Sequence, residues 1–204
     1  QVQRNIEIGI SRLGRFQNAS GGLGYWMGEN TANDWGTSYA GHFMIEAEKK
    51  GFVLPLSFKS NWIAYQRQAA RNWRPSYKHY HSDFAQAYRL YTLALAGSPD
   101  LASMNRLREF EEISNDAKWR LAAAYALAGQ KEASEAIYKT ANIDFQSPEA
   151  DNYTYGSIYR NRAMALETML ITDHPKKAEL AKSIAKSLAS DRWMNTQTTA
   201  YNLL

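Results

Sequence analysis

The stretch SDFAQAYRLYTLALAGSPD, residues 82–100, carries the pattern that most clearly indicates the fold class. Four of its apolar residues recur every three or four positions, as on the buried face of an α-helix. They are Phe84, Tyr88, Tyr91 and Leu95. Gly97 follows them, where many helices end in a left-handed turn. The residues Ser98-Pro99-Asp100 read as the N-cap, first-turn proline and acidic first turn of another helix. The stretch therefore predicts a helix over about 82–96 and a second helix after a short loop.

The same unit of an apolar helix, a glycine stop and a short loop recurs along the chain. Helical periodicity predicts segments near 2–13, 36–50, 58–73, 82–96, 101–110, 116–128, 131–141, 158–170, 173–188 and from 196 onward. Ser147-Pro148-Glu149 is a further start signal, and Asp173 and Pro175 are read as opening the helix of 173–188. Strand signals are nearly absent, so we predict an all-α fold. Helical pairs of this kind build a solenoid, a bundle or a closed α/α toroid, and no repeat of one fixed period supports a tetratricopeptide or ankyrin array.

Composition places the chain among ordinary folded proteins. Its 204 residues suit one domain, residues 1–204, with 45% hydrophobic and 22% charged residues and a net charge of +4. The chain has no cysteine, which excludes disulfides, thiolate metal sites and cysteine nucleophiles within it. No apolar run is long enough to span a membrane. The chain starts at Gln1 and stops inside an apolar helical pattern, so we expect a fragment of a longer protein.

A glycine-rich aromatic loop is the one strong local departure from this pattern. It runs Ser20-Gly21-Gly22-Leu23-Gly24-Tyr25-Trp26-Met27-Gly28, and eight of the twelve glycines precede residue 42. A phosphate-binding loop would need a preceding strand and a following Gly-Lys-Ser/Thr, and both are missing. We therefore predict a structural loop in which Gly21, Gly22 and Gly24 allow close backbone packing.

Three segments in order carry a resemblance to a known family. The loop Gly21–Trp26 comes first, Trp35-Gly36-Thr37-Ser38-Tyr39-Ala40 follows about ten residues later, and Trp193-Met194-Asn195-Thr196-Gln197-Thr198-Thr199-Ala200-Tyr201 lies near the end. Their order and spacing resemble the thioester-domain region of bacterial α-2-macroglobulins. The resemblance covers nearly the whole chain, from about Ile6 to Leu204, and includes the helices ending at Gly97 and Gly129.

This resemblance implies both a fold and a function. The fold is an α/α toroid of paired helices, incomplete at one or both ends, inserted in a multi-domain protein. The implied function is that of a non-catalytic scaffold in an extracytoplasmic protease trap of the periplasm or cell envelope. Its implied partners are the neighbouring domains of the parent chain and proteases, and no cofactor is expected. In the family a Cys-x-Glu-Gln motif forms an internal thioester that acylates the protease. The chain holds no cysteine, so it could only shield a thioester located elsewhere in the parent.

The resemblance also sets expectations for particular side chains. Tyr25 and Trp26 are expected to plug the toroid interior or its rim. Complement-like relatives carry a histidine between the glycine loop and the next helix, which redirects acylation towards hydroxyls. The stretch from Tyr25 to Trp35 has no histidine, so a parent with a thioester is expected to prefer amines.

A basic segment offers a second reading. Between residues 49 and 82 there are seven basic residues and no acidic one, with aromatics interleaved: Lys49, Lys50, Lys59, Arg67, Arg71, Arg74 and Lys78. Such a composition suits a single-stranded nucleic-acid groove, but Trp62 and Tyr65 are better explained as core. We expect no nucleic-acid partner and retain Arg67, Arg71, Arg74 and Lys78 as candidates for a domain contact. A helical-repeat binding scaffold remains an alternative.

Metal and carbohydrate chemistry give the remaining alternatives. His79-Tyr80-His81 with Asp83, or His42 with Glu46 one turn later, could hold a metal only with further ligands, and we expect none. Many α/α toroids are carbohydrate-active enzymes that use two carboxylates at a set separation. Candidate carboxylates are Glu29, Asp34, Asp83 and Asp151, although nothing in the sequence marks any two as a pair.

Overall fold

The computed structural model describes residues 1–75, 82–143, 154–191 and 193–204, and these residues form an all-helical fold. The helices are α1 (Val2–Gly14), α2 (Asp34–Lys49), α3 (Phe58–Asn72), α4 (Ser82–Leu95), α5 (Leu101–Arg108), α6 (Asn115–Leu127), α7 (Lys131–Tyr138), α8 (Ile158–Ile171), α9 (Lys177–Leu188) and α10 (Thr196–Leu203). Within the described residues the only β pairing is an isolated bridge between Gln17 and Leu23. The predicted all-α class is confirmed.

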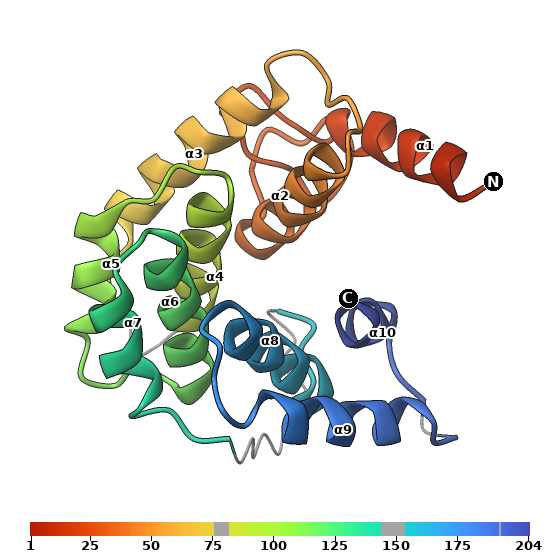
Figure 1. Ribbon diagram of the computed structural model, residues 1–204. Coiled ribbons are helices and arrows are strands. Elements are labelled where there is room, and N and C mark those ends of the chain that lie inside the picture. The colour runs from red at the N-terminus through yellow and green to blue at the C-terminus, as the bar shows by residue number, and fades with distance from the viewer. Residues whose placement is uncertain (76–81, 144–153, 192) are drawn as a thin grey trace.

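The helices alternate between an inner and an outer layer (Figure 1). Along the inner layer α2 packs on α4, α4 on α6, α6 on α8 and α8 on α10. The outer helices pack against this layer from outside: α1 and α3 on α2, α3 and α5 on α4, α5 and α7 on α6, and α9 on both α8 and α10. In Figure 1 the layers curve into an open ring, with α1 and α10 on the same side of it. This is the paired-helix arrangement of an α/α toroid.

The inner layer is the core of the molecule. Residues 83–94 of α4 are all buried, because α2, α3, α5 and α6 pack around this helix. A helix that is apolar nearly all round belongs inside a domain, which matches the alanine-rich and aromatic sequence of α4 and α6. The outer helices α1, α7 and α9 are amphipathic and bury few residues each.

Small residues let the two layers approach closely. A Cβ added at Gly41 of α2 would lie 2.3 Å from the indole of Trp62 on α3. Trp62 is almost fully buried, and its Nε1 donates a hydrogen bond of 2.8 Å to the carbonyl of Thr37. The absence of a side chain at Gly41 therefore lets α3 pack closely on α2. The prediction that Trp62 belongs to the core is confirmed.

Two predicted helix starts are wrong by a few residues. Asp100 is the N-cap of α5, because its side chain accepts a hydrogen bond from the Ser103 amide, so Ser98 lies outside the helix. Asp173 does not open α9, which begins at Lys177. Its positive φ of 54° places it in the turn that ends α8. The start signal Ser147-Pro148-Glu149 lies outside the described residues.

The glycine stops are confirmed. Gly51, Gly97 and Gly129 have positive φ values of 88°, 74° and 77°, each two residues after the last residue of α2, α4 or α6. In the left-handed conformation their amides bond back to the last helical turn. No helix in the described part of the chain is long and apolar enough to cross a bilayer.

Candidate functional site

The glycine-rich loop lies between the start of α2 and the start of α3. Gly21 has a φ of 91°, and a Cβ there would lie 2.3 Å from the carbonyl oxygen of Asn61. A Cβ at Gly22 would lie 2.5 Å from that of Ala32. Both positions therefore exclude side chains, and the predicted reason for these glycines, close backbone packing, is observed.

Side-chain hydrogen bonds anchor the loop to both helices. Gln17 Nε2 donates to the carbonyl of Gly21 at 2.9 Å and to that of Phe58 at 3.0 Å. The Leu23 amide donates to Thr37 Oγ1 at 2.9 Å, and Thr37 Oγ1 donates to the carbonyl of Leu23 at 3.2 Å. These hydrogen bonds hold the base of the loop against α2 and α3.

The tip of the loop turns away from the interior. One carboxylate oxygen of Glu29 accepts hydrogen bonds from the amides of Tyr25, at 2.8 Å, and Trp26, at 3.0 Å. The Tyr25 side chain is 50% exposed and that of Trp26 is 67% exposed. These exposures argue against a position in the toroid interior, because the Glu29-capped turn leaves both rings in solvent, whereas a position at the toroid rim stays a prediction. They form an edge-to-face aromatic pair on the surface, with ring centroids 5.2 Å apart.

A polar centre, which the sequence analysis missed, lies where the inner helices meet. Every inner helix contributes to it, and its members are His42 of α2, Tyr88 and Tyr91 of α4, Arg120 of α6, Glu167 of α8 and Tyr201 of α10. Figure 1 shows these helices side by side around the concave side of the ring.

An ion pair forms one half of the polar centre. Arg120 Nη2 lies 2.5 Å from Glu167 Oε2, and the Tyr91 hydroxyl donates to Glu167 Oε1 at 2.6 Å. The guanidinium of Arg120 also lies 4.3 Å from the centroid of the Tyr91 ring, which is a cation–π distance. Three inner helices are thereby joined through one carboxylate.

Histidine and tyrosine form the other half. His42 Nδ1 lies 3.1 Å from the Tyr88 hydroxyl and 3.3 Å from the Tyr201 hydroxyl, which are hydrogen-bonded to each other. His42 Nε2 lies 3.7 Å from Glu167 Oε1. Glu46, one turn after His42 on α2, instead pairs with Lys49 at 2.9 Å on the helix surface.

Burial sets the protonation states of this cluster. Burial lowers the pKa of His42, although the nearby carboxylate of Glu167 opposes this effect. Burial alone would raise the pKa of Glu167, but Arg120 and His42 together hold it below its usual value. Burial raises the pKa of Tyr88 well above its usual value. At neutral pH the centre therefore holds one ion pair, a neutral imidazole and neutral phenols.

This arrangement suits holding helices together better than proton transfer. Glu167 is already neutralised by Arg120 and cannot act as a strong base. The tyrosines are poor proton donors because burial and the Glu167 charge keep them neutral. The hydrogen bonds that Arg120 and Glu167 make here all join one inner helix to another.

The basic segment is largely neutralised by partners outside it. Arg71 Nε lies 2.9 Å from Asp100 Oδ2, and Lys59 Nζ lies 2.5 Å from Glu48 Oε2. Arg74 donates to the carbonyls of Arg71 and Trp73 at the end of α3. Arg67 is half-buried, and Lys78 lies outside the described residues. The structure thus brings together no continuous basic groove from the described members of this segment.

The three candidate carboxylates that lie within the described residues each have a structural partner. Glu29 caps the loop tip, Asp34 lies 2.8 Å from Arg89, and Asp83 accepts from the Ser114 amide at 2.7 Å. Asp151 lies outside the described residues, as do His79 and His81. Among the residues that the structure describes, no cluster of three metal-ligating side chains occurs.

The chain was compared with protein families, curated sequences and solved structures. No protein-family model and no curated protein sequence matches the chain. Solved structures do match. Escherichia coli α-2-macroglobulin activated by porcine elastase is 19% identical, with a TM-score of 0.85 over 98% of this chain and 19% of that chain. The native Escherichia coli protein, from domain MG7 to the C-terminus, is 20% identical with a TM-score of 0.83, over 98% of this chain and 33% of that one.

A third match comes from another bacterium. The structure of Salmonella α-2-macroglobulin reacted with methylamine is 23% identical, with a TM-score of 0.81 over 96% of this chain and 14% of that chain. The chain thus spans between 14% and 33% of the length of these three proteins. The likeness confirms at the level of fold what the three sequence segments predict: the chain has the fold of a part of bacterial α-2-macroglobulins.

Proposed function

We propose that the chain is the helical domain of a bacterial α-2-macroglobulin-like protease trap, in which it acts as a non-catalytic scaffold. The observation that carries this proposal is the match of 98% of the chain to Escherichia coli α-2-macroglobulin at a TM-score of 0.85. A match of this extent leaves almost no part of the chain for a different architecture.

The segments of the sequence resemblance support the same proposal. Gly21 and Gly22 anchor the loop against α3 and the Ala32 region. Trp35 is buried beneath the guanidinium of Arg160, 4.8 Å from its ring. Tyr201 joins the polar centre. Trp35 and Tyr201 thus take part in contacts that join α2 to α8 and α10. The residues that carry the family resemblance therefore lie at contacts between the inner helices.

The role of the domain in the trap is to pack against neighbouring modules. Tyr25 and Trp26 are large aromatic side chains exposed on a rigid loop, and aromatic residues are enriched in protein interfaces. We assign this loop tip to a contact with a module of the parent chain. If the parent carries a thioester, the same contact shields it from water.

The proposal includes location and chemistry. Two of the similar structures are of protein activated by proteases, and one is of protein reacted with methylamine. By resemblance to these proteins, the parent would be an extracytoplasmic protein of the periplasm or cell envelope, with proteases as its targets. A thiol for the thioester would have to lie outside residues 1–204, which contain no cysteine.

The test uses the full-length parent protein. Its intact mass is measured before and after methylamine treatment, together with free thiol, and the protein is then incubated with trypsin or elastase. A gain of one methylamine with release of one thiol indicates a live thioester. Retention of the protease without methylamine uptake indicates a trap without covalent capture. A parent that neither reacts nor retains a protease refutes the proposed function.

A further inference from the structure

The segment between α2 and α3 has an unusual combination of features. Phe52-Val53-Leu54-Pro55-Leu56 is wholly apolar and forms neither helix nor paired strand. Val53 is 89% exposed and Leu56 is 98% exposed, whereas Phe52 and Leu54 are half-buried. From Phe52 to Leu54 the side chains alternate between inward and outward, which is the period of a β-strand.

The backbone of this segment is free to pair. The Phe52 amide donates to the Ala47 carbonyl at the end of α2, and the Pro55 carbonyl accepts from the Phe58 amide at the start of α3. Between these two bonds, the amides and carbonyls of Val53 and Leu54 have no hydrogen-bond partner among the described residues. An exposed extended segment with unpaired main-chain groups is a template for an added strand.

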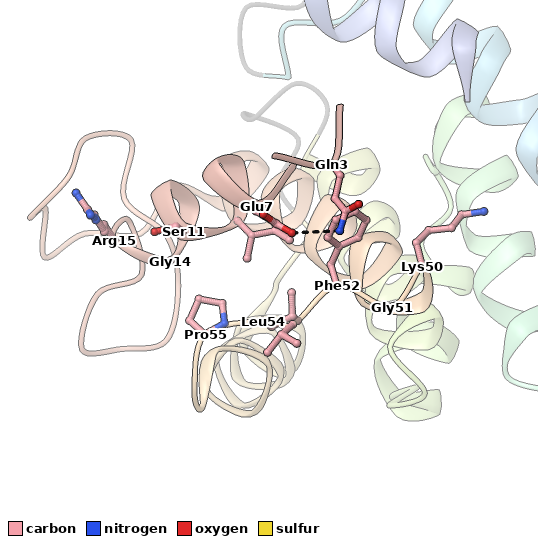
Figure 2. Close-up of a pocket in the computed structure, with 12 residues that line it drawn as sticks. Gln3, Glu7, Ser11, Gly14, Arg15, Lys50, Gly51, Phe52, Leu54 and Pro55 are labelled. Carbon is pink, nitrogen blue, oxygen red and sulfur yellow. Dashed lines mark hydrogen bonds between the residues drawn. The ribbon is translucent and has the colours of Figure 1, made fainter. Parts of the chain in front are cut away.

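Hollows flank the segment on both sides. Figure 2 shows the first, where α1 faces the chain from Lys50 to Pro55. This groove has a volume of about 790 Å³. A second hollow, of about 570 Å³, lies between the same segment and the first turn of α3. The segment is therefore a ridge with room beside it for the side chains of a paired strand.

The charges at the groove favour an acidic occupant. Arg15 and Lys50 lie at opposite ends of the groove in Figure 2, and neither has an ion-pair partner among the described residues. The acidic residue between them, Glu7, accepts a hydrogen bond from Gln3 at 3.4 Å. A carboxylate on the incoming segment would meet either free cation at a solvent-accessible rim, where charges guide association.

We propose that residues 52–54 form a docking strand for an extended, aliphatic and acidic segment from another module of the same parent chain. The matching solved structures support this source, since the fold occupies only 14% to 33% of the chains that contain it. This inference rests on the proposed function, because that function supplies the parent chain from which the docking segment would come. Main-chain hydrogen bonds to residues 52–54 set the register of the incoming strand. The exposed side chains of Val53 and Leu56 provide apolar surface for that strand to cover.

The test is a photo-crosslink in the full-length parent. The crosslinking residue p-benzoylphenylalanine replaces Val53, with a matched control at the exposed Leu170 of α8, and crosslinked peptides are mapped by mass spectrometry. The expected product joins position 53 to an extended segment outside residues 1–204 of the same molecule. A crosslink between two copies, or a yield no higher than at position 170, overturns the proposal.

Charge reversal tests the acidic character of the occupant. Lys50→Glu, combined with the crosslinker at position 53, should reduce the yield by about fivefold, because like charges at an interface rim slow association. Lys131→Glu, on the exposed surface of α7, is the matched control and should leave the yield unchanged. Equal yields in the two variants would refute an acidic occupant.

The outcomes separate this inference from the proposed function. A parent that reacts with methylamine or retains a protease, but gives no crosslink at position 53, supports the proposed function and refutes the docking strand. A parent that gives the crosslink, but neither reacts with methylamine nor retains a protease, supports the docking strand and refutes the proposed function as a protease trap.

Discussion

Replacing Glu167 by glutamine tests whether the ion pair of the polar centre stabilises the fold. Glu167→Gln keeps the shape of the side chain and removes the charge that lies 2.5 Å from Arg120 Nη2. The Arg120 side chain is 0% exposed, and its Nε and Nη1 have no hydrogen-bond partner among the described residues. Glu167 is therefore the main compensation for a buried positive charge.

The expected loss follows from this geometry. Removing one partner of a buried ion pair typically costs about 3–5 kcal/mol, because the remaining charge is stranded. The Glu167 side chain is 20% exposed, so some water can reach the guanidinium after the substitution. We therefore expect a loss near the lower end, about 2–4 kcal/mol. For a domain of this size that corresponds to a fall in Tm of about 10 °C.

Thermal and urea unfolding at neutral pH provide the measurement. The matched control is Glu135→Gln, which removes the carboxylate of an exposed pair with Lys139 at 2.7 Å on α7. Exposed pairs contribute little, so the control should unfold at the wild-type temperature. A Glu167→Gln variant that unfolds together with the control would refute the claim that the ion pair stabilises the inner layer.

Three further predictions concern single positions. Because burial lowers the pKa of His42 below its usual 6.5, the unfolded chain binds more protons just below that pH, so stability should fall as pH drops through this range. His42→Gln should flatten that dependence in Tm measurements between neutral and mildly acidic pH. Gly28→Ala should cost about 1 kcal/mol for its positive φ, and Gly21→Ala at least about 2 kcal/mol because its Cβ also meets backbone, as urea midpoints would show. Asp100→Ala should cost about 1–2 kcal/mol in urea unfolding, because it removes both the α5 cap and the carboxylate that pairs with Arg71, whereas Ser98→Ala should cost almost nothing.

The helices and their ends were the features most open to prediction from sequence. Their signals are local: an apolar face with a period of three or four residues, followed by a glycine with positive φ, as at Gly97. The error at Ser98 arose because two nearby residues could serve as the helix cap, and the error at Asp173 arose because an acidic residue also suits the left-handed turn after α8. Asp100 caps α5 in place of Ser98, since its carboxylate reaches the amide of Ser103.

The polar centre could not be predicted in the same way, because its contacts are distant in sequence. His42 and Tyr201 are separated by 159 residues, and Arg120 and Glu167 by 47. Periodicity indicates that these side chains face inward, but it does not say which polar groups meet. The available signal was Arg120 itself, a charged residue within the apolar run of α6 that must have a buried partner.

The basic segment shows the opposite difficulty. A run of cations without acids between residues 49 and 82 suggests a free positive surface. The fold instead brings Asp100 to Arg71 and Glu48 to Lys59. Net charge along a sequence window therefore predicts surface potential poorly when helices from neighbouring segments pack against it.

Replacing both members of the central ion pair shows which group causes the loss in Glu167→Gln. Arg120→Met combined with Glu167→Leu removes the stranded charge, and such apolar replacements are often neutral or stabilising by about 1–4 kcal/mol. The Tyr91 hydroxyl, however, loses its acceptor at 2.6 Å, which costs about 1–3 kcal/mol when the group stays buried. We therefore expect the double variant to recover most of the lost stability, but not all of it. A double variant no more stable than Glu167→Gln would contradict the reasoning that a stranded Arg120 guanidinium causes most of the loss in the single variant.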